Sequence, residues 1–406
     1  MEVGAILERG TRLWDMRGTR LSQMSETQHS ASEAAPTATI ANTEAEAVEE
    51  VIHLVNGMTL DERISRLLSV GEEVVTEDNL RQLLSKKDHP VCYDGFEPSG
   101  RMHIAQGILR SINTNKCTSA GCHFVFWVAD WFAMMNNKMG GDLKKIRVVG
   151  EYMIEVWKAA GMNMENVTFL WSSDEINARS NEYWPLVMDI ARRNNVSRIQ
   201  RCGQIMGRSD GGDMPAAQIF YPCMQCADIF FLKVDICSLG MDQRKVNMLA
   251  REYCDQIKRK NKPISLAHHM VSGLLEGQEK MSKSDPNSAI FMEDSEKDVN
   301  TKIKKAFCPP GIVAGNPILD YTKHIILPGL GQLVIERKEE NGGTVTYENW
   351  EALQADYEQE KVHPGDLKPA VAKAINKLIE PVRRHFETDP RAKELLKRVK
   401  AFKVTK

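Results

Sequence analysis

Residues 93–107 read Tyr-Asp-Gly-Phe-Glu-Pro-Ser-Gly-Arg-Met-His-Ile-Ala-Gln-Gly. An apolar run at 91–93 leads into this stretch, Pro, Ser and Gly punctuate it at 98–100, and apolar residues follow at helical spacing over 103–116. The pattern predicts a strand, a tight turn and a helix. Such a turn directs backbone N–H groups and the positive end of a helix dipole at one point, where a phosphate can bind. His103 would add a donor there, although for this stretch taken alone an ordinary turn with a surface histidine is the better explanation.

A second stretch, residues 280–284, reads Lys-Met-Ser-Lys-Ser and lies in a polar loop between Gly273 and Pro286. Lys280 and Lys283, together with the two hydroxyl groups, can neutralise the oxygen atoms of a leaving pyrophosphate. Most lysine- and serine-rich loops are simply solvated, so this stretch alone does not establish a site.

Together the two stretches resemble the paired signatures of class I aminoacyl-tRNA synthetases, which carry His-Ile-Gly-His-like and Lys-Met-Ser-Lys-Ser motifs around one ATP. The first motif departs from the family pattern, because Ala105 and Gln106 stand where Gly and His are usual. The resemblance implies that ATP binds as its Mg²⁺ complex, with no tightly bound protein metal. It implies catalytic roles for His103, Lys280 and Lys283, and ATP contacts from Gly95, Gly100, His103, Asp242 and Lys283.

The composition is that of a globular protein of 406 residues, long enough for two or three domains. The net charge of −2 provides no global attraction to nucleic acid, so RNA contacts would use local patches. Nine scattered cysteines and no secretory signal predict reduced intracellular thiols. No apolar run approaches the ~18 residues that a membrane span requires.

The first 50 residues are predicted to form a disordered N-terminal extension. Residues 25–50 contain six Glu and no Lys or Arg, a composition that cannot bury a core. Residues 1–24 carry four Arg and three acidic residues, whereas transit peptides are poor in acids. We therefore expect a cytoplasmic protein, with import into an organelle disfavoured.

From residue 51 onward, short apolar runs alternate with helical patterns. Strands are expected at 91–93, 124–129, 167–170, 231–236 and 264–267, and helices at 60–75, 79–86 and 143–160, among others. This alternation predicts an α/β fold with a Rossmann-type doubly wound parallel sheet, whose ligands bind at the carboxyl ends of the strands. The predicted catalytic domain covers 51–298, with an insertion at about 174–215.

Residues 299–406 turn mainly helical, with helices expected at 349–359, 369–386 and 391–402. The part from 361 to 406 contains 13 Lys and Arg against 5 Asp and Glu, which suits a phosphate backbone. Solvated helix faces explain this charge about equally well. By the resemblance, this region is an anticodon-binding domain for tRNA, and the insertion builds the interface of a homodimer.

The helix expected from Tyr221 carries a polar stripe through apolar surroundings. Tyr221, Gln225 and Asp228 are spaced i, i+4 and i+7, so they share one helix face. Buried polar groups need partners, so the stripe either forms an internal network or holds a small polar ligand. Gln243, after the next strand, and Tyr93, at the end of the first, would face the same crevice.

This pattern resembles the tyrosine pocket of archaeal and eukaryotic tyrosyl-tRNA synthetases. From about residue 55 to the C-terminus, the amino-acid sequence is most similar to the plant cytosolic members of that family. The resemblance implies that Tyr93 and Asp228 bind the phenol group of the substrate. It also implies that Tyr221, Gln225 and Gln243 hold the amino group and the backbone side of L-tyrosine.

The resemblance further assigns tRNA contacts to Arg244 and Lys245, at the acceptor stem, and to His363 and Asp366, at the anticodon. One departure bears on the anticodon. Asn341 stands before a Gly-Gly pair where the family usually has an aromatic residue. Because stacking contributes ~1–3 kcal/mol per base, we expect weaker anticodon recognition.

Metal ligation is not expected from the remaining candidates. Cys223 and Cys226 have the spacing of a ligand pair, but no second pair lies at zinc-finger spacing. His268 and His269 lack an evident carboxylate partner in the sequence.

The implied activity is that of a tyrosine–tRNA ligase, which forms tyrosyl-adenylate, releases pyrophosphate and transfers tyrosine to tRNA(Tyr) in translation. Tryptophanyl-tRNA synthetase, which shares the fold and signatures, is the main alternative. A pantothenate-type ligase and a catalytically inactive RNA-binding paralogue are more distant alternatives. The basic C-terminal region argues against the former, and the intact Lys280–Ser284 run argues against the latter.

Overall fold

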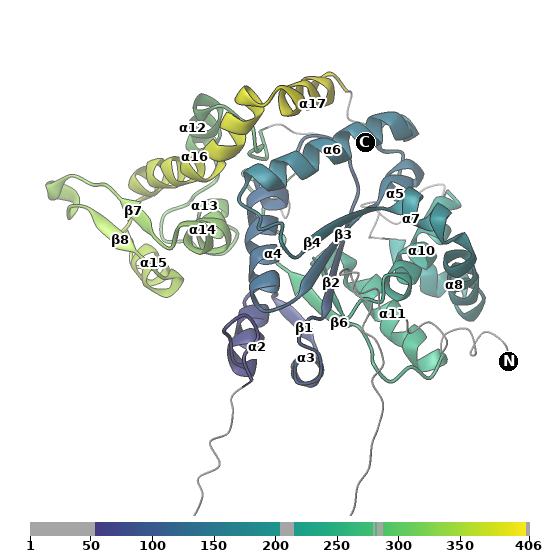
Figure 1. Cartoon of the computed structure of the whole chain (residues 1–406). Helices are drawn as coiled ribbons and strands as arrows, with labels where there is room; N and C mark the ends of the chain where they lie inside the picture. The colour runs from purple at the N-terminus through teal and green to yellow at the C-terminus, as the bar shows by residue number, and fades with distance from the viewer. Residues whose placement is uncertain (1–52, 204–214, 279–280, 282–286, 403–406) are drawn as a thin grey trace, which may run out of the picture. The chain divides into compact units, whose positions relative to one another are not determined.

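The computed structural model describes residues 53–203, 215–278, 281 and 287–402 (Figure 1). The described residues belong to one compact unit. The N-terminal extension, part of the insertion, Lys280 and Lys283 lie outside the described residues. Among the described helices, none combines the length and apolar character needed to cross a bilayer.

A six-stranded sheet in the order β1-β6-β5-β2-β3-β4 forms the centre of the fold. Its neighbouring strands are parallel, except that β1 runs antiparallel to β6. The chain builds outward from β2 through β3 and β4 on one side, and through β5 and β6 on the other. The predicted doubly wound sheet is therefore confirmed, with its order reversing between β2 and β5, where ligands bind in such folds. The strands are β1 (Glu73–Val75), β2 (Val91–Phe96), β3 (His123–Val128), β4 (Val167–Trp171), β5 (Ile236–Gly240) and β6 (Ile264–His268).

Helices cover both faces of the sheet (Figure 1). The helices before residue 260 are α2 (Leu60–Leu68), α3 (Glu77–Leu84), α4 (Arg110–Ser119), α5 (Asp130–Met135), α6 (Leu143–Ala159), α7 (Ser172–Ala178), α8 (Ser180–Arg193), α9 (Val196–Gln200), α10 (Ala217–Phe231) and α11 (Arg244–Gln256). Short 3₁₀ turns lie at η2 (Lys138–Gly141) and η4 (Met241–Gln243).

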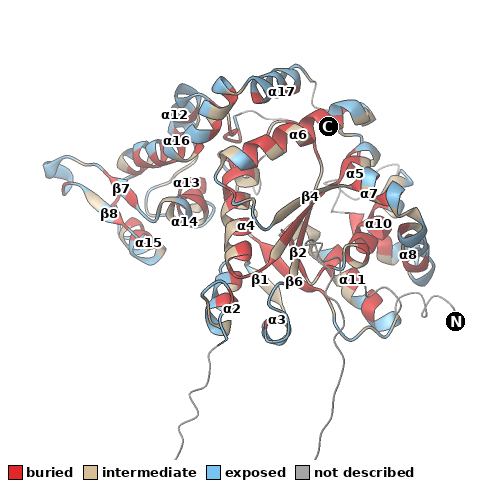
Figure 2. Cartoon of the chain, viewed as in Figure 1, coloured by how far each residue is buried: buried red, intermediate tan, exposed pale blue. Residues whose placement is uncertain are grey.

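The strand side chains alternate between two apolar layers, and the four central strands β2, β3, β5 and β6 are mostly buried, whereas the edge strands β1 and β4 are half-buried (Figure 2). Cys92 and Phe126 pack into the layer that holds α4 and α6. Tyr93 and Trp127 pack into the layer that holds α8 and α10. Because successive side chains of a strand point to opposite faces, Tyr93 lies on the face that α10 covers.

The C-terminal part is mainly helical, as expected, and also contains a two-stranded hairpin. Its elements are α12 (Glu296–Lys305), α13 (Pro317–Tyr321), η5 (Thr322–Ile326), α14 (Leu327–Leu330), β7 (Leu333–Ile335), η6 (Glu339–Asn341), β8 (Val345–Tyr347), α15 (Trp350–Glu358), α16 (Pro364–Thr388) and α17 (Pro390–Ala401). The predicted division between residues 298 and 299 falls within α12 and stays a prediction.

The last two helices pack on α6. The rings of Tyr152 and Phe386 lie 5.4 Å apart, and His385 Nε2 lies 3.0 Å from Glu155 Oε2. An aromatic contact and a hydrogen bond therefore both hold the C-terminal helices against the sheet's helical layer.

The helix expected over 60–75 is too long. It ends at Leu68, and Val74 and Val75 instead pair with β6. These residues are β-branched and fit the pleated edge of a sheet, so tertiary pairing overrides the helical spacing.

The strand expected over 231–236 is wrong. The apolar residues Ile229 and Phe231 continue the buried face of α10, and Lys233 then turns the chain with a φ of 54°. The strand begins at Ile236. An apolar run of this length fits a buried helix end as well as a strand.

The helix after the first signature begins with a π turn, η1 (Ala105–Leu109), before α4. The indole N–H of Trp157 donates to the Gln106 carbonyl at 2.8 Å. At Gly107 a Cβ atom would lie 2.3 Å from Met292 Sδ. Any larger residue there would force Met292 to move, so glycine lets this helix pack closely against Met292.

Candidate active site

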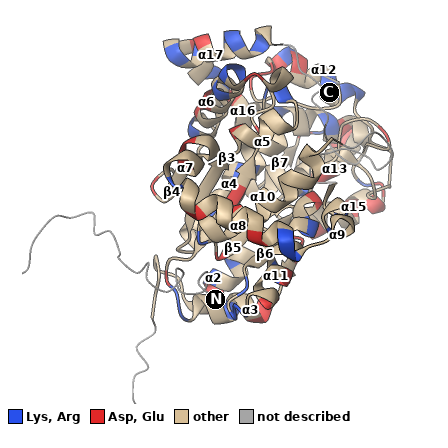
Figure 3. Ribbon diagram, turned by 90° about the vertical axis from the view of Figure 1, so that its right-hand side faces the viewer, with Lys and Arg blue, Asp and Glu red and all other residues tan. Residues whose placement is uncertain are grey.

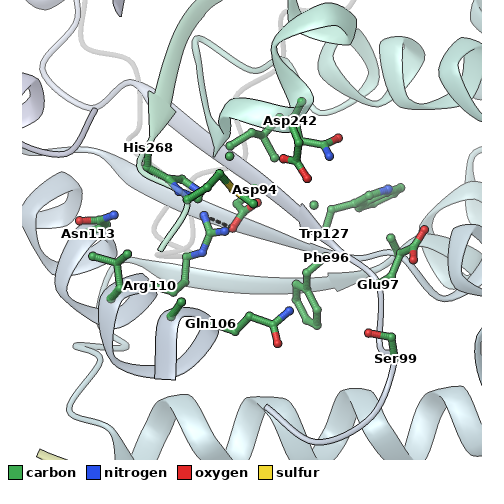
Figure 4. Close-up of a pocket in the computed structure, with 18 of the residues that line it drawn as sticks. Asp94, Phe96, Glu97, Ser99, Gln106, Arg110, Asn113, Trp127, Asp242 and His268 are labelled. Atoms are coloured by element: carbon green, nitrogen blue, oxygen red, sulfur yellow. Dashed lines mark ion pairs between the residues drawn. The ribbon is translucent and has the colours of Figure 1, made fainter. Parts of the chain in front are cut away.

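A cavity of about 340 Å³ opens at the carboxyl ends of β2, β5 and β6 (Figure 4). All five residues predicted for the tyrosine pocket line it: Tyr93, Tyr221, Gln225, Asp228 and Gln243. Three of those predicted for ATP also line it: Gly95, His103 and Asp242. Gly100 does not, although its φ of 126° allows the sharp turn that precedes His103.

One end of the cavity is defined by a buried carboxylate. Asp228 on α10 is 1% exposed, and its Oδ2 atom has no hydrogen-bond partner among the described residues. Burial raises the pKa of Asp228 well above its usual value, while the nearby hydroxyl of Tyr183 and indole N–H of Trp127 favour the charged form. Tyr93 approaches the same place from β2. A Cβ atom at residue 95 would contact the Tyr93 hydroxyl oxygen at 2.7 Å, so Gly95 makes room for that phenol.

Tyr183 also lies at this end of the cavity, and the sequence did not predict it as a site residue. Its hydroxyl group donates to Asp228 Oδ1 at 2.8 Å from α8, in the predicted insertion. Tyr183, Val187 and Ile190 are all buried at helical spacing, so this helix face was readable as apolar. The spacing does not indicate that the Tyr183 hydroxyl group bonds to the carboxylate of Asp228, which lies 45 positions further along the chain.

The middle of the cavity is rich in hydrogen-bond acceptors. The Gln225 amide donates to Gln243 Oε1 at 3.0 Å, which leaves the buried Gln225 Oε1 without a partner among the described residues. The Tyr221 hydroxyl donates to Glu97 Oε1 at 2.8 Å. An ammonium group, which only donates, matches this set of acceptors.

Glu97 is a second residue that the sequence reading missed. Asn136 donates to both of its carboxylate oxygens at 3.0 Å, and Lys138 lies 3.8 Å from Oε2. These partners come from the segment after β3. Glu97 lies in the Phe-Glu-Pro-Ser-Gly turn, which we interpreted only as the connection between strand and helix.

At the other end of the cavity, Asp94 and Arg110 form an ion pair at 2.5 Å (Figure 4). Asp94 is 2% exposed, and burial raises its pKa to about 7, even though Arg110 lowers it and Asp242 raises it further. Arg110 also donates to the Ser238 carbonyl at 3.3 Å. This end therefore carries a carboxyl group that titrates near neutral pH.

His268, at the end of β6, lies beside this pair (Figure 4). Burial and the neighbouring Arg110 lower the pKa of His268 well below its usual value, so the ring is neutral at pH 7. Its Nδ1 atom lies 3.2 Å from the His269 carbonyl, which only accepts, so Nδ1 carries the proton. Nε2 is then a buried acceptor with no partner among the described residues, suited to an amino or hydroxyl group of a ligand.

The first signature and the described residues of and after the second one meet at this cavity. His103 pairs with Phe291 in an isolated bridge, and Ile104 N donates to the Ile290 carbonyl at 2.8 Å. Residues just after the Lys-Met-Ser-Lys-Ser run are thus held against the first signature. Met281, the described member of that run, is 7% exposed and lines the cavity.

His269 corrects the expectation that this histidine lacks a carboxylate partner. Its Nδ1 atom contacts Glu72, its Nε2 atom lies 2.7 Å from Asp320 Oδ1, and both carboxylates raise its pKa. Ligand atoms of Glu72, His269 and His324 lie within 4.8 Å of one another. The two imidazole rings, however, stack at 3.9 Å and 16°. Nearly parallel rings do not direct their lone pairs at one point, so we interpret the group as an ion-pair network.

The residues predicted for tRNA lie outside the lining of this cavity. Arg244 forms two hydrogen bonds to Glu73, at 2.6 and 2.7 Å, and Lys245 is exposed. His363 caps α16 by accepting from Gly365 N at 3.0 Å, and Asp366 lies in the first turn of that helix.

Comparison with known proteins gives one consistent family. The sequence pattern of "tRNA synthetases class I (W and Y)" matches residues 85–380. The chain is 65% identical over 347 residues to tyrosine–tRNA ligase 1, cytoplasmic, of Arabidopsis thaliana, covering 86% of this chain and 90% of the relative.

Solved structures agree with this. A Leishmania major tyrosyl-tRNA synthetase in complex with tyrosinol is 53% identical with a TM-score of 0.80, covering 85% of this chain and 61% of that one. A Pyrococcus horikoshii tyrosyl-tRNA synthetase complexed with L-tyrosine is 35% identical with a TM-score of 0.78, covering 84% and 100%. A tryptophanyl-tRNA synthetase from Aeropyrum pernix is 16% identical with a TM-score of 0.57, covering 81% and 85%, a likeness of fold alone.

Proposed function

This chain belongs to the class I tRNA synthetases, in the branch of the tyrosine–tRNA ligases, and from this membership we propose how its cavity carries out the reaction. Its activity is the ATP-dependent joining of tyrosine to tRNA. The observation that supports the choice of amino acid is the buried Asp228 carboxylate facing Tyr93 in the cavity. A phenol hydroxyl group both donates and accepts and so pairs with both residues, whereas an indole N–H only donates.

We assign the amino-acid end accordingly. Asp228 and Tyr93 bind the phenol hydroxyl group, and Tyr183 holds Asp228 in place. Tyr221, Gln225 and Gln243 hold the ammonium group and the backbone side of tyrosine. Glu97 acts through Tyr221, whose hydroxyl group it fixes at 2.8 Å.

We assign ATP to the other end, where it enters as its Mg²⁺ complex. His103 and the turn that contains Gly95 and Gly100 face the phosphates, and Asp242 reaches the ribose. Lys280 and Lys283 contact the pyrophosphate that leaves. His268 Nε2 would accept a hydrogen bond from the nucleotide, because its lone pair is buried in the lining of this end.

The chemistry then needs little acid–base catalysis from the protein. A tyrosine carboxylate oxygen attacks the α-phosphorus of ATP, and the bond to the β-phosphate oxygen breaks as pyrophosphate leaves. A ribose hydroxyl group at the tRNA end then attacks the carbonyl carbon of the adenylate, and AMP leaves. Positioning and stabilisation of charge account for most of the first step.

Amino-acid-dependent exchange between ATP and pyrophosphate tests this function. We expect tyrosine alone among the twenty amino acids to support strong exchange, and tRNA to be charged with it. Exchange that depends on tryptophan would contradict the pocket assignment. Exchange without charging would favour a nucleotidyltransferase of another kind, and no exchange would favour an inactive paralogue.

The titration of Asp94 predicts a pH dependence for ATP. As pH falls from about 8 to about 6, Asp94 gains a proton around its pKa of about 7 and stops repelling the polyanionic nucleotide. The KM for ATP should therefore fall by roughly threefold, the size of a partly screened interaction between charges. Asp94→Asn, which stays neutral, should keep a low and flat KM. Exchange kinetics at three pH values measure this, and an unchanged pH slope in the variant would disprove the role of Asp94.

We propose that tRNA binds along the basic C-terminal helices. Lys and Arg residues occur on successive turns of α17 (Figure 3). With the overall charge at −2, such a local patch is what attracts a phosphate backbone. Arg244 and Lys245 would contact the acceptor stem, and His363 and Asp366 the anticodon.

Replacing Asp366 by Ala should lower tRNA charging while leaving tyrosine-dependent exchange intact, since Asp366 does not line the active-site cavity. We expect roughly a tenfold loss in kcat/KM for tRNA, the size of one lost hydrogen bond to a base. Glu394→Ala, which also removes a carboxylate from a C-terminal helix, is the matched control. A parallel loss in exchange would show that Asp366 mainly stabilises the start of α16.

We further propose a homodimer that acts in the cytoplasm. Three large apolar side chains are exposed on α8–α10: Met188 at 60%, Val196 at 58% and Phe220 at 45%. In this proposal the three side chains form part of the dimer interface, since contiguous exposed apolar surface marks interaction sites. The cytoplasmic assignment follows the Arabidopsis relative.

A further inference from the structure

A second cavity lies at the end of the sheet opposite the active site, and we propose that it binds a compact polyphosphate anion. Its volume is about 600 Å³, within the range of small-molecule sites. Ile264, the first residue of β6, and Asp235, just before β5, help to line it, whereas the active-site cavity lies at the other ends of these strands. The two cavities have no lining residue in common.

The lining is strongly basic. Six of the lining side chains are cationic and one is acidic: Lys86, Lys87, Arg251, Arg259, Lys260, Lys262 and Asp235. Asp235 forms an ion pair with Lys87 at 2.5 Å. Lys262 forms an ion pair at 2.6 Å with Asp255, which does not line the cavity. The other four cations have no carboxylate partner among the described residues.

Two of these four cations are held in fixed positions. Arg251 donates to the Pro263 and Val75 carbonyls at 2.8 and 3.2 Å. Arg259 donates to the Asn261 carbonyl at 3.0 Å and lies over the Phe230 ring at 5.2 Å. Carbonyl oxygens orient a guanidinium group but do not neutralise it. Rigid guanidinium groups are well suited to phosphate.

Helix dipoles do not account for this charge. The cavity adjoins the C-terminal ends of α3 and α11, and each carries a partial charge of roughly −0.5. Two such ends offset about one of the four cations. An excess of about three positive charges remains around one cavity, and an anion with three or four charges would relieve that repulsion.

The lining also indicates which part of a ligand is recognised. Its neutral residues are amides and aliphatic side chains, without an aromatic ring that could stack on a base. The site therefore binds the phosphate chain of its ligand, and both inorganic tripolyphosphate and a nucleoside triphosphate contain such a chain.

Calorimetric titration of the full chain with inorganic tripolyphosphate tests the proposal. Titrations with and without a saturating non-hydrolysable tyrosyl-adenylate analogue distinguish binding at the active site from binding at the second cavity. We expect one binding component to survive the analogue. It should weaken at least tenfold in Lys86→Gln/Lys260→Gln, because two charges are removed, and recover in Lys86→Arg/Lys260→Arg. Lys144→Gln/Lys305→Gln removes two exposed lysines that lie outside this cavity and should leave it unchanged.

The proposal is overturned if no component survives the analogue, or if both glutamine double variants weaken binding equally. Tyrosine-dependent exchange should remain normal in Lys86→Gln/Lys260→Gln, which shows that this variant is folded and separates the test from that of the active site. Competition by ATP but not by AMP would identify a nucleoside triphosphate as a ligand, and failure of ATP to compete would restrict the site to inorganic polyphosphate.

Discussion

Asp228→Ala is expected to lose at least about 10²-fold in kcat/KM for tyrosine, with a much smaller proportional loss for phenylalanine. A pocket that is complementary only to the aromatic ring cannot reject phenylalanine well. A pocket with buried polar groups that hydrogen-bond the tyrosine hydroxyl group rejects phenylalanine strongly, because phenylalanine leaves those groups unpaired. For tyrosine-activating synthetases as a class this discrimination is about 10⁵, a class value that we adopt as the wild-type reference. Asp228 fits this role, since it is 1% exposed and its Oδ2 has no partner among the described residues.

Two conservative variants serve as controls for Asp228→Ala. Tyr93→Phe should be milder, because Asp228 remains as the acceptor. Tyr183→Phe removes the hydroxyl group that donates to Asp228 Oδ1 at 2.8 Å, outside the direct contact with substrate, and should change the tyrosine-to-phenylalanine ratio least. Exchange kinetics with both amino acids give the ratio in each variant, and thermal melting monitors the fold. If the ratio in Asp228→Ala stays at the wild-type value, Asp228 does not read the hydroxyl group and the pocket must be redrawn.

Lys283→Ala is expected to slow tyrosyl-adenylate formation by about 10²-fold or more, the usual effect of losing a charge that stabilises a transition state. Tyrosine binding should barely change, because we assign Lys283 to the phosphates of ATP and not to the amino acid. Lys283 lies outside the described residues, but Met281 in the same run lines the cavity, and residues 290–292 are bonded to the first signature.

Pre-steady-state adenylation and equilibrium tyrosine binding separate these two effects. Lys297→Ala is the matched control, since it removes an exposed lysine from α12, shortly after the loop. Normal adenylation in Lys283→Ala would rule out the phosphate role. An equal loss in Lys297→Ala would point instead to a general electrostatic effect of the region.

Local patterns were sufficient for the architecture. The strands at 123–128, 167–171 and 264–268 were predicted to within one residue at each end, and the strand at 91–96 was predicted at its start but ended three residues too early. Apolar runs between turn residues are a local signal. The polar stripe on α10 was predicted as well, since helical spacing brings Tyr221, Gln225 and Asp228 to one face. The boundaries failed where competing signals were close, as at residues 73–75 and 231–236.

The partners of charged and polar residues could not be predicted in the same way. Asp94 pairs with Arg110, His269 contacts Glu72 and Asp320, and Tyr183 reaches Asp228. Each partner lies between 16 and 197 positions away in the chain. Contacts at such distances depend on which strands are neighbours and on how each helix crosses the sheet, and no periodicity in the sequence encodes them.

The sequence by itself therefore determined the doubly wound sheet, the two signatures and the polar helix, because backbone preferences and side-chain spacing are local properties. Only the tertiary structure decided the environment of each group. It buried Asp94 beside Arg110 and so raised its pKa to about 7. It left His268 neutral with an acceptor atom in the cavity, and it gathered six cations from three segments around the second cavity. Burial and electrostatic interaction depend on distances in space, and these exist only after the chain has folded.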